Sequence, residues 1–206
     1  TAGVDGTSRL EIETDRIPET VVQQKQTHYT LADTKPNQEW VFLQNPHTEN
    51  YQLSKQAFLL RGTDVPLHAE SDSPTWIGIR QKEMDFRFTT EMTLTAQDAG
   101  ITVYMTGGQH YDLFVSMREG APHLVRRAQL GALVHEDTVK LPDSINSVQL
   151  TVRGDAMTYH FFAACGAEHI DMGALETKYL STETAGNFTG VMLALFAHDA
   201  NPAEEL

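Results

Sequence analysis

The chain has 206 residues, a formal net charge of −13 and a single cysteine, Cys165. This length is enough for one domain with a sizeable core, and one cysteine excludes an intrachain disulfide framework. The negative charge argues against nucleic acids and anionic membrane surfaces as partners, whereas a neutral sugar, a protein or a cation stays compatible. No apolar run reaches the roughly 20 residues needed to span a bilayer.

Residues 1–36 are polar and poorly periodic, which predicts a linker or a surface arm, and residues 37–206 are predicted to form the folded domain. No signal peptide is visible, and the opening "TAGVDGTSRLE" resembles the interior of a longer chain. We therefore expect a module of a larger protein. Extracellular, periplasmic and cytoplasmic locations all stay open, with the first two favoured.

Short alternating stretches separated by turn residues begin at Trp40 and predict strands in chain order. In the stretch 86–94, Phe86, Phe88, Met92 and Leu94 share one face. Further strands are predicted at 101–105, 111–117, 148–152 and 158–164. The almost wholly apolar stretch 188–197 is typical of a central strand covered on both sides.

The stretch "GITVYMTGGQHYDLFVSM", residues 100–117, predicts a hairpin that turns at Gly107 and Gly108. One face of this hairpin is apolar and predicts a core face, whereas the opposite face is expected to be wet. That opposite face carries Tyr104, Asp112, Phe114 and Ser116.

Half-polar strands of this kind favour antiparallel sheets that pack one face and expose the other. Because no long helical period occurs, the predicted fold class is all-β, a two-sheet antiparallel β-sandwich.

Motifs for nucleotide binding or nucleophilic catalysis are missing from the sequence. "TGGQH" is a turn, not a phosphate loop, and no GxSxG stretch occurs. Cys165 and His169 are close in sequence, but a strand-end cysteine beside small residues is more often inert. The acidic loops 68–73 and 198–205 lack calcium-loop or zinc spacing, which leaves a structural calcium ion possible and no other cofactor expected.

Aromatic and planar polar side chains on the wet faces of the predicted strands are the strongest functional signal. Sugars offer apolar C–H faces to aromatic rings and hydroxyls to planar hydrogen-bonding groups. The candidate carbohydrate-binding residues are Tyr104, Asp112, Phe114, Arg87, His160 and Phe162, with Arg80 and Gln81 at the end of a strand. A covering loop, layer or partner domain is the competing interpretation for each aromatic residue.

Four stretches in order resemble the C-terminal β-sandwich of glycoside hydrolase family 43 β-xylosidases. They are "QEWVFLQNPHTENYQLSKQAFLLRGT", "SPTWIGIRQKEMDFRFTTEMTL", "DAGITVYMTGGQHYDLFV" and "NFTGVMLALFA". The resemblance covers about residues 38–198. Trp76 stands where the family usually has Phe, Ile79 where it has Arg, and Ala194 where it has Gly.

The resemblance implies a concanavalin A-like jelly roll with an accessory role. In such enzymes the hydrolytic carboxylates lie in a separate β-propeller catalytic domain, and the sandwich packs against it and can lend a loop residue to the active-site rim. The family's loop aromatic falls on Phe188. The family's closing strand has no counterpart after residue 198, so the strand is either cut off or replaced at the sheet edge by the N-terminal arm.

Three functions remain open from the sequence. The first is a non-catalytic carbohydrate-binding module of a hemicellulose-degrading hydrolase that binds xylan or arabinoxylan. The second is a structural domain that packs on a catalytic propeller of the same chain and completes its active-site rim. The third is an autonomous glycosidase, which needs two carboxylates facing each other across a cleft.

Overall fold

Short strands form nearly all of the regular structure in residues 39–54, 57–186 and 190–199, which the computed structural model describes. The strands are β1 (Trp40–Phe42), β2 (Tyr51–Leu53), β3 (Phe58–Leu60), β4 (Thr75–Arg80), β5 (Phe86–Thr93), β6 (Asp98–Thr106), β7 (Gln109–Arg118), β8 (Ala121–Leu130), β9 (Leu133–Lys140), β10 (Ser147–Gly154), β11 (Thr158–Cys165), β12 (Glu168–Glu176) and β13 (Met192–His198). The described helical turns are η1 (Thr48–Asn50), η2 (Thr177–Leu180) and α1 (Thr182–Ala185). None of the described helices is long and apolar enough to cross a membrane.

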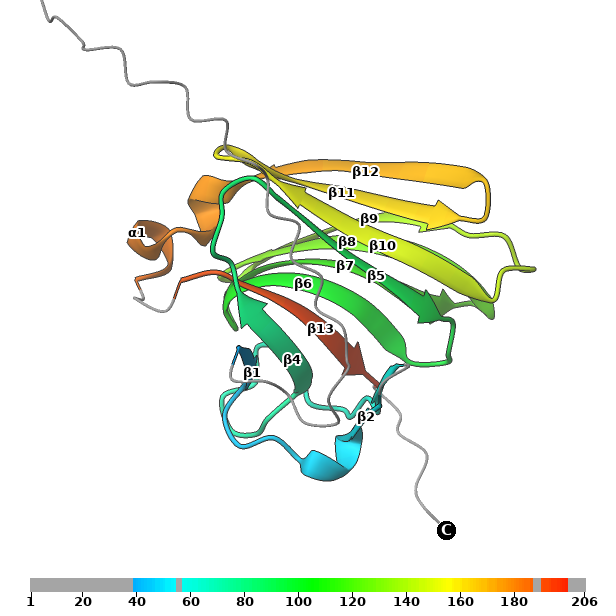
Figure 1. Cartoon of the computed structure of the whole chain (residues 1–206), viewed down its shortest axis with the longest axis horizontal. Helices are drawn as coiled ribbons and strands as arrows, with labels where there is room; N and C mark the ends of the chain where they lie inside the picture. The colour runs from blue at the N-terminus through cyan, green and yellow to red at the C-terminus, as the bar shows by residue number, and fades with distance from the viewer. Residues whose placement is uncertain (1–38, 55–56, 187–189, 200–206) are drawn as a thin grey trace, which may run out of the picture. The chain divides into compact units, whose positions relative to one another are not determined.

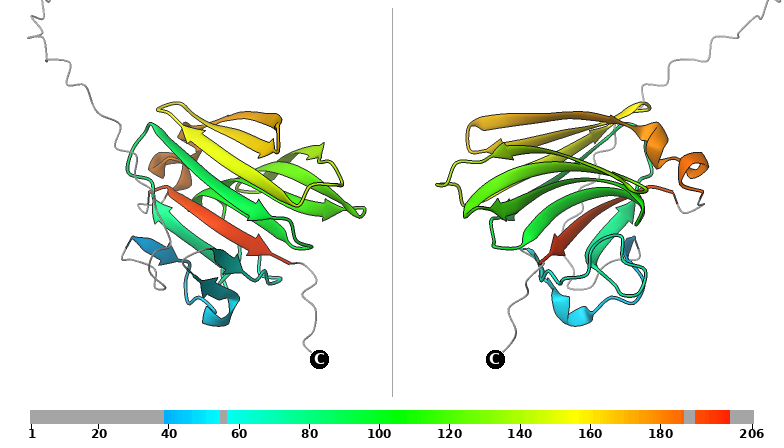
Figure 2. Two further views of the ribbon diagram at one scale, coloured as in Figure 1. Left: turned by 45° about the vertical axis from the view of Figure 1, so that its right-hand side comes forward. Right: turned by 180° about the vertical axis from the view of Figure 1, so that it is seen from behind.

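Two antiparallel sheets make a sandwich, as predicted. The large sheet has seven strands in the order β1-β4-β13-β6-β7-β8-β9, and the small sheet has four in the order β12-β11-β10-β5. Figure 1 shows the small sheet lying over the large one, and the views in Figure 2 show the same two layers. A third, two-stranded sheet of β2 and β3 lies near β4.

The core between the sheets is built from one face of each strand. On the large sheet Ile101, Val103, Tyr111 and Leu113 are almost fully buried. The Tyr111 ring meets the rings of Tyr159 and Phe161 on β11 edge-on, each at 6.4 Å between centroids. The Tyr111 hydroxyl donates a hydrogen bond to the Glu176 carbonyl, which ties the two sheets together at this end.

The predicted strands and hairpin are confirmed. β5 alternates half-buried and exposed residues along its length, and β6 and β7 pair as the two arms of the hairpin. The apolar stretch that ends at residue 197 supplies β13, which lies between β4 and β6 inside the large sheet. β8, β9 and β12 were not among the predicted strands.

The edge of the large sheet beside β4 is β1, at residues 40–42. The predicted arm, residues 1–36, lies outside the described residues, so that assignment stays a prediction.

Candidate functional site

The outer face of the large sheet, which points away from the small sheet, holds the hairpin residues that were expected to meet solvent. The register places Phe114 opposite Gly100, Asp112 opposite Thr102 and His110 opposite Tyr104. The face assignment is therefore correct, but the expected exposure is wrong. Asp112 and Phe114 are 0% exposed and Tyr104 is 9% exposed.

These hairpin residues are buried because a second apolar core lies on this outer face. Its members are Leu67, Trp76, Tyr104, Phe114, Val125, Met192, Ala194 and Phe196, with Leu43 packed against them. The Trp76 and Tyr104 rings lie 5.5 Å apart, and the Phe114 and Phe196 rings 5.8 Å apart. Alternation of apolar and polar residues along a strand shows that a side chain points away from the core between the sheets. It does not show whether that side chain contacts water or a second core.

A row of charged side chains borders this second core. The Asp112 oxygens lie 2.9 and 3.1 Å from His110 Nδ1, and one lies 3.8 Å from Arg127 Nη1. Arg127 Nε donates to Glu136 at 2.8 Å, and Arg118 Nη2 donates to the other Glu136 oxygen at 2.7 Å. Burial raises the pKa of Glu136, but the hydrogen bonds from these two arginines outweigh burial and hold it below its usual value.

Sequence reasoning missed His110, Arg127 and Glu136 as members of this row. The signal was present, since Asp112, Arg127 and Glu136 are successive cross-strand partners on β7, β8 and β9. Finding it requires the register, which the sequence alone does not give.

Three buried polar atoms on the same face have no hydrogen-bond partner among the described residues. They are Trp76 Nε1, Thr102 Oγ1 and His110 Nε2. Buried polar groups of this kind are usually satisfied by ordered water. Burial and the nearby Asp112 charge raise the pKa of Tyr104 to about 12, so its hydroxyl stays a neutral donor at physiological pH.

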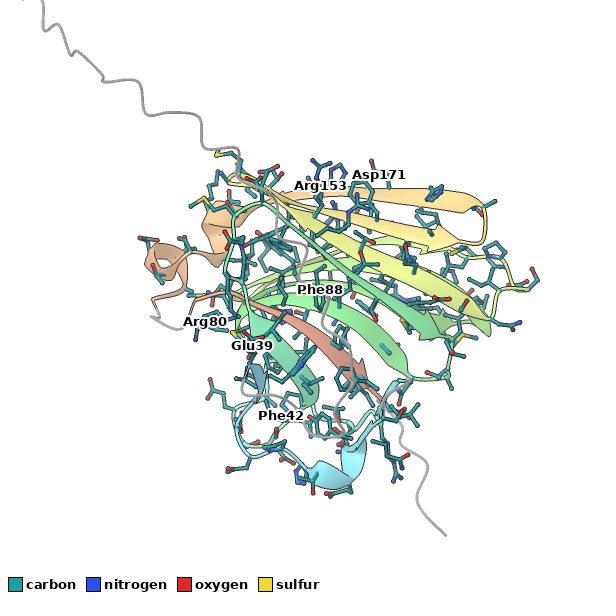
Figure 3. All side chains as sticks on the ribbon, in the orientation of Figure 1. Glu39, Phe42, Arg80, Phe88, Arg153 and Asp171 are labelled. Carbon is teal, nitrogen blue, oxygen red and sulfur yellow. The ribbon has the colours of Figure 1, made fainter. Side chains whose placement is uncertain are left out.

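The outer face of the small sheet carries a different part of the predicted set. Arg87 is exposed, and His160 and Phe162 are half-buried. The His160 and Phe162 rings stack with centroids 4.2 Å apart and planes at 29°. An Asp171 carboxylate oxygen lies 2.7 Å from His160 Nε2. Figure 3 labels Asp171 on β12 and Arg153 on β10, the strands on either side of β11. These residues lie on the opposite side of the sandwich from Tyr104, Asp112 and Phe114.

Arg80 and Gln81 lie at a third place, the end of β4. Arg80 is exposed, and its Nη1 lies next to Gly190. Gln81 is fixed in place, because its Oε1 accepts a hydrogen bond from Tyr159 and its backbone N–H donates to the Val191 carbonyl. Phe188, the residue implied by the resemblance, lies outside the described residues. The eight candidate residues in the described part of the chain therefore do not converge on one site.

Cys165 is buried, and burial together with Glu168 raises the pKa of its thiol, which disfavours the nucleophilic thiolate. Within the described part of the chain, no group of three or more His, Cys, Asp or Glu side chains is placed to hold a metal ion. The first acidic loop lies in that part, whereas most of the second lies beyond it.

Antiparallel double-sheet sandwiches are shared by many unrelated domains, lectin-type jelly rolls among them. The family described as the β-xylosidase C-terminal concanavalin A-like domain matches residues 20–205. The non-reducing end α-L-arabinofuranosidase BoGH43B of Bacteroides ovatus is 27% identical over 177 residues, which make up 81% of this chain and 33% of the relative.

Solved structures agree with this match. Bacteroides ovatus xyloglucan PUL GH43B has a TM-score of 0.77 at 25% identity, over 84% of this chain and 35% of that one. The xylan β-1,4-xylosidase of Bacillus halodurans C-125 has a TM-score of 0.76 at 18% identity, over 86% of this chain and 36% of that one, a likeness of fold. The chain spans about a third of the length of these relatives.

The chain belongs to the family of C-terminal concanavalin A-like domains of β-xylosidases. Its relatives are glycoside hydrolase family 43 proteins, and this domain is the accessory domain of such enzymes.

Proposed function

We propose that this chain is a non-catalytic structural domain of a hydrolase that acts on arabinose- or xylose-containing polysaccharides, and that it packs on the catalytic domain. The names of its relatives support the substrate class, since one is an α-L-arabinofuranosidase and another a xylan β-1,4-xylosidase. A chain that spans about a third of such relatives leaves room for a catalytic domain, which we infer to be a propeller of the same polypeptide.

The observation that carries this proposal is the burial of Asp112 and Phe114. A sugar-binding platform needs an open aromatic face, and this face is instead filled by a second core and a row of ion pairs. Such packing makes a stiff scaffold. The burial of Tyr104, Asp112 and Phe114 therefore argues against xylan binding at these residues.

The end of β4 is the surface we assign to the active-site rim. Arg80 projects there beside Gly190, and Gln81 is held by Tyr159 and by the backbone of residue 191. A fixed backbone with one exposed guanidinium suits a contact to sugar hydroxyls at a domain junction. Phe188 precedes Gly190 by two residues and belongs to the same proposal.

The test uses the parent hydrolase, with steady-state kinetics on an aryl arabinofuranoside and an aryl xyloside. Arg80→Ala and Phe188→Ala are each expected to lower kcat/KM about tenfold or more, because contacts at the rim position the substrate. Lys140→Gln, on β9, is the matched control and should leave kcat/KM unchanged. Wild-type kinetics in both rim variants would refute the rim role.

Carbohydrate binding on the outer face of the small sheet is a second candidate. The observation that favours it is the half-exposed stacked pair of His160 and Phe162, which offers a flat surface to a sugar ring. Calorimetric titration of the chain with xylohexaose should release heat, and Phe162→Ala should weaken binding at least tenfold. Absence of binding by the wild-type chain would eliminate this candidate and leave the structural role intact.

A further inference from the structure

Two arginines face each other on the outer face of the small sheet. Arg87 on β5 and Arg153 on β10 are direct cross-strand partners, and both are exposed. Opposite residues of an antiparallel pair have Cα atoms about 4.5–5.5 Å apart, and like charges in that arrangement repel. Arg118, Arg126 and Arg127 each form an ion pair, whereas neither Arg87 nor Arg153 has a described carboxylate within 4.0 Å.

The two carboxylates nearest this surface, Asp155 and Asp171, already hold other hydrogen-bond donors. Asp155 accepts hydrogen bonds from the backbone N–H groups of Met157 and Thr158 and from the Thr158 hydroxyl. Arg153 makes the smallest contribution to the lowered pKa of Asp155. Asp171 binds His160 and the Gly173 N–H. The arginine pair is therefore a local concentration of positive charge in a chain of net charge −13.

The arginine pair adjoins the ring pair. Arg153 is the cross-strand partner of His160 on its other side, so Arg87, Arg153 and His160 form one row across three strands. The next row holds Thr89, Thr151 and Phe162, and the two threonine hydroxyls lie 3.0 Å apart. Residues two apart on a strand are separated by about 6.6–6.8 Å, so the aromatic surface, the hydroxyls and the guanidinium groups are within reach of one sugar residue.

We propose that this surface binds a uronic acid residue carried by an otherwise neutral glycan. The ring of the uronic acid stacks on Phe162 and His160, its hydroxyls meet Thr89 and Thr151, and its carboxylate accepts hydrogen bonds from Arg87 and Arg153. Guanidinium groups suit this task because their donors match the two carboxylate oxygens. The proposal rests on the carbohydrate-binding candidate above and names its ligand.

The net charge of the chain restricts the ligand further. A dense polyanion meets repulsion from the acidic surface as a whole. A single carboxylate on a neutral backbone is attracted by the two arginines that it contacts and repelled by Asp171, which lies beside Phe162 and His160, all within a Debye length of about 8 Å. The ligand class is therefore a sparsely substituted acidic glycan, such as a xylan that bears single glucuronic acid groups.

Calorimetry with two oligosaccharides tests the proposal. The probes are xylotetraose and the same backbone with one glucuronic acid substituent. The wild-type chain should bind the acidic probe about tenfold more tightly at low salt, and 0.5 M NaCl should shrink this preference because it screens the charges. Equal affinity for the two probes would overturn the uronate site but leave neutral xylan binding in place.

Variants of Arg87 and Arg153 test whether these two residues cause the preference for the acidic probe. Arg87→Gln/Arg153→Gln should abolish the preference for the acidic probe and keep or raise the melting temperature, because the repulsion is removed. Lys82→Gln/Lys140→Gln removes the same charge from two exposed lysines elsewhere and should keep the preference. A preference that survives in the double arginine variant refutes the proposal, and so does failure of the wild-type chain to bind either probe. In that last case the proposed rim role is still tested by the kinetics of the parent hydrolase.

Discussion

Asp112 shows how a single residue can look functional and be structural. A carboxylate among aromatic residues on the outward face of a hairpin resembles a sugar contact, yet this one is 0% exposed and is held by His110 and Arg127. Buried charges persist in proteins when they are paired and hydrogen-bonded, as this one is. Replacing Asp112 should therefore lower the stability of the domain and have no direct effect on ligand binding.

We expect Asp112→Ala to lower the free energy of unfolding by about 3 kcal/mol, because it leaves His110 without its carboxylate partner and removes a buried acceptor from Arg127. Urea unfolding measures the change. Asp143→Ala, at an exposed aspartate whose ion pair among the described residues is with Lys140, should stay within about 0.5 kcal/mol of wild type. Equal stability of the two variants would show that the charged row contributes nothing.

Gly100 makes room for Phe114 in the second core. A Cβ at this position would overlap the Leu113 carbonyl oxygen and lie 2.5 Å from Phe114 Cα, so backbone atoms would have to move. Gly100→Ala should cost about 2–3 kcal/mol of unfolding free energy. Gly108→Ala, whose Cβ would meet only Thr106 Oγ1 at 3.9 Å, is the matched control and should change little. A Gly100→Ala protein as stable as this control would contradict the packing described for Phe114.

At the scale of elements, the sequence is most informative where one face of a strand is apolar. The alternation in β5 and β6 and the apolar run of β13 predicted their positions correctly. β8 and β9 were missed because Arg126, Arg127, Glu136 and Asp137 interrupt the pattern. These charges pair across the strands, and only the register reveals that they compensate one another.

The exposure of the hairpin face was mispredicted because the residues that cover it, such as Leu43 and Leu67, are distant from it in sequence.

The cross-strand pair of Arg87 and Arg153 gives a prediction about the small sheet itself. Arg153→Thr should raise the free energy of unfolding by about 0.5 kcal/mol, because it removes a like-charge pair and introduces a good strand former. Urea unfolding at low and high salt measures the gain, which should shrink as salt screens the repulsion. Arg118→Thr makes the informative contrast, since Arg118 binds Glu136 and its loss should destabilise the protein. A destabilised Arg153→Thr protein would show that Arg153 has a stabilising role in the absence of ligand.

On the scale of the whole molecule, the sandwich separates three tasks onto three surfaces. The outer face of the large sheet is a second core, the end of β4 carries the proposed rim contact, and the outer face of the small sheet is the open surface that we propose for an acidic sugar. Because these surfaces lie apart, substitutions at one should leave the others intact, and the kinetic and calorimetric tests above address separate properties of the domain.

Acid sensitivity is a property of the whole molecule that follows from its carboxylates. The pKa of Asp155 is lowered by the Met157 and Thr158 N–H groups, that of Asp171 by the Gly173 N–H and His160, and that of Asp72 by His47 and the Ser73 N–H. Because each folded-state pKa lies below the ordinary 3.8, the unfolded chain takes up protons first as the pH falls. The stabilising contribution of these three carboxylates is thus complete above about pH 5 and is lost as the pH falls through their folded-state pKa values.

The midpoint of urea unfolding should therefore drop between pH 5 and pH 3. Asp155→Asn should make this drop shallower, and a midpoint independent of pH in this range would contradict the assignment.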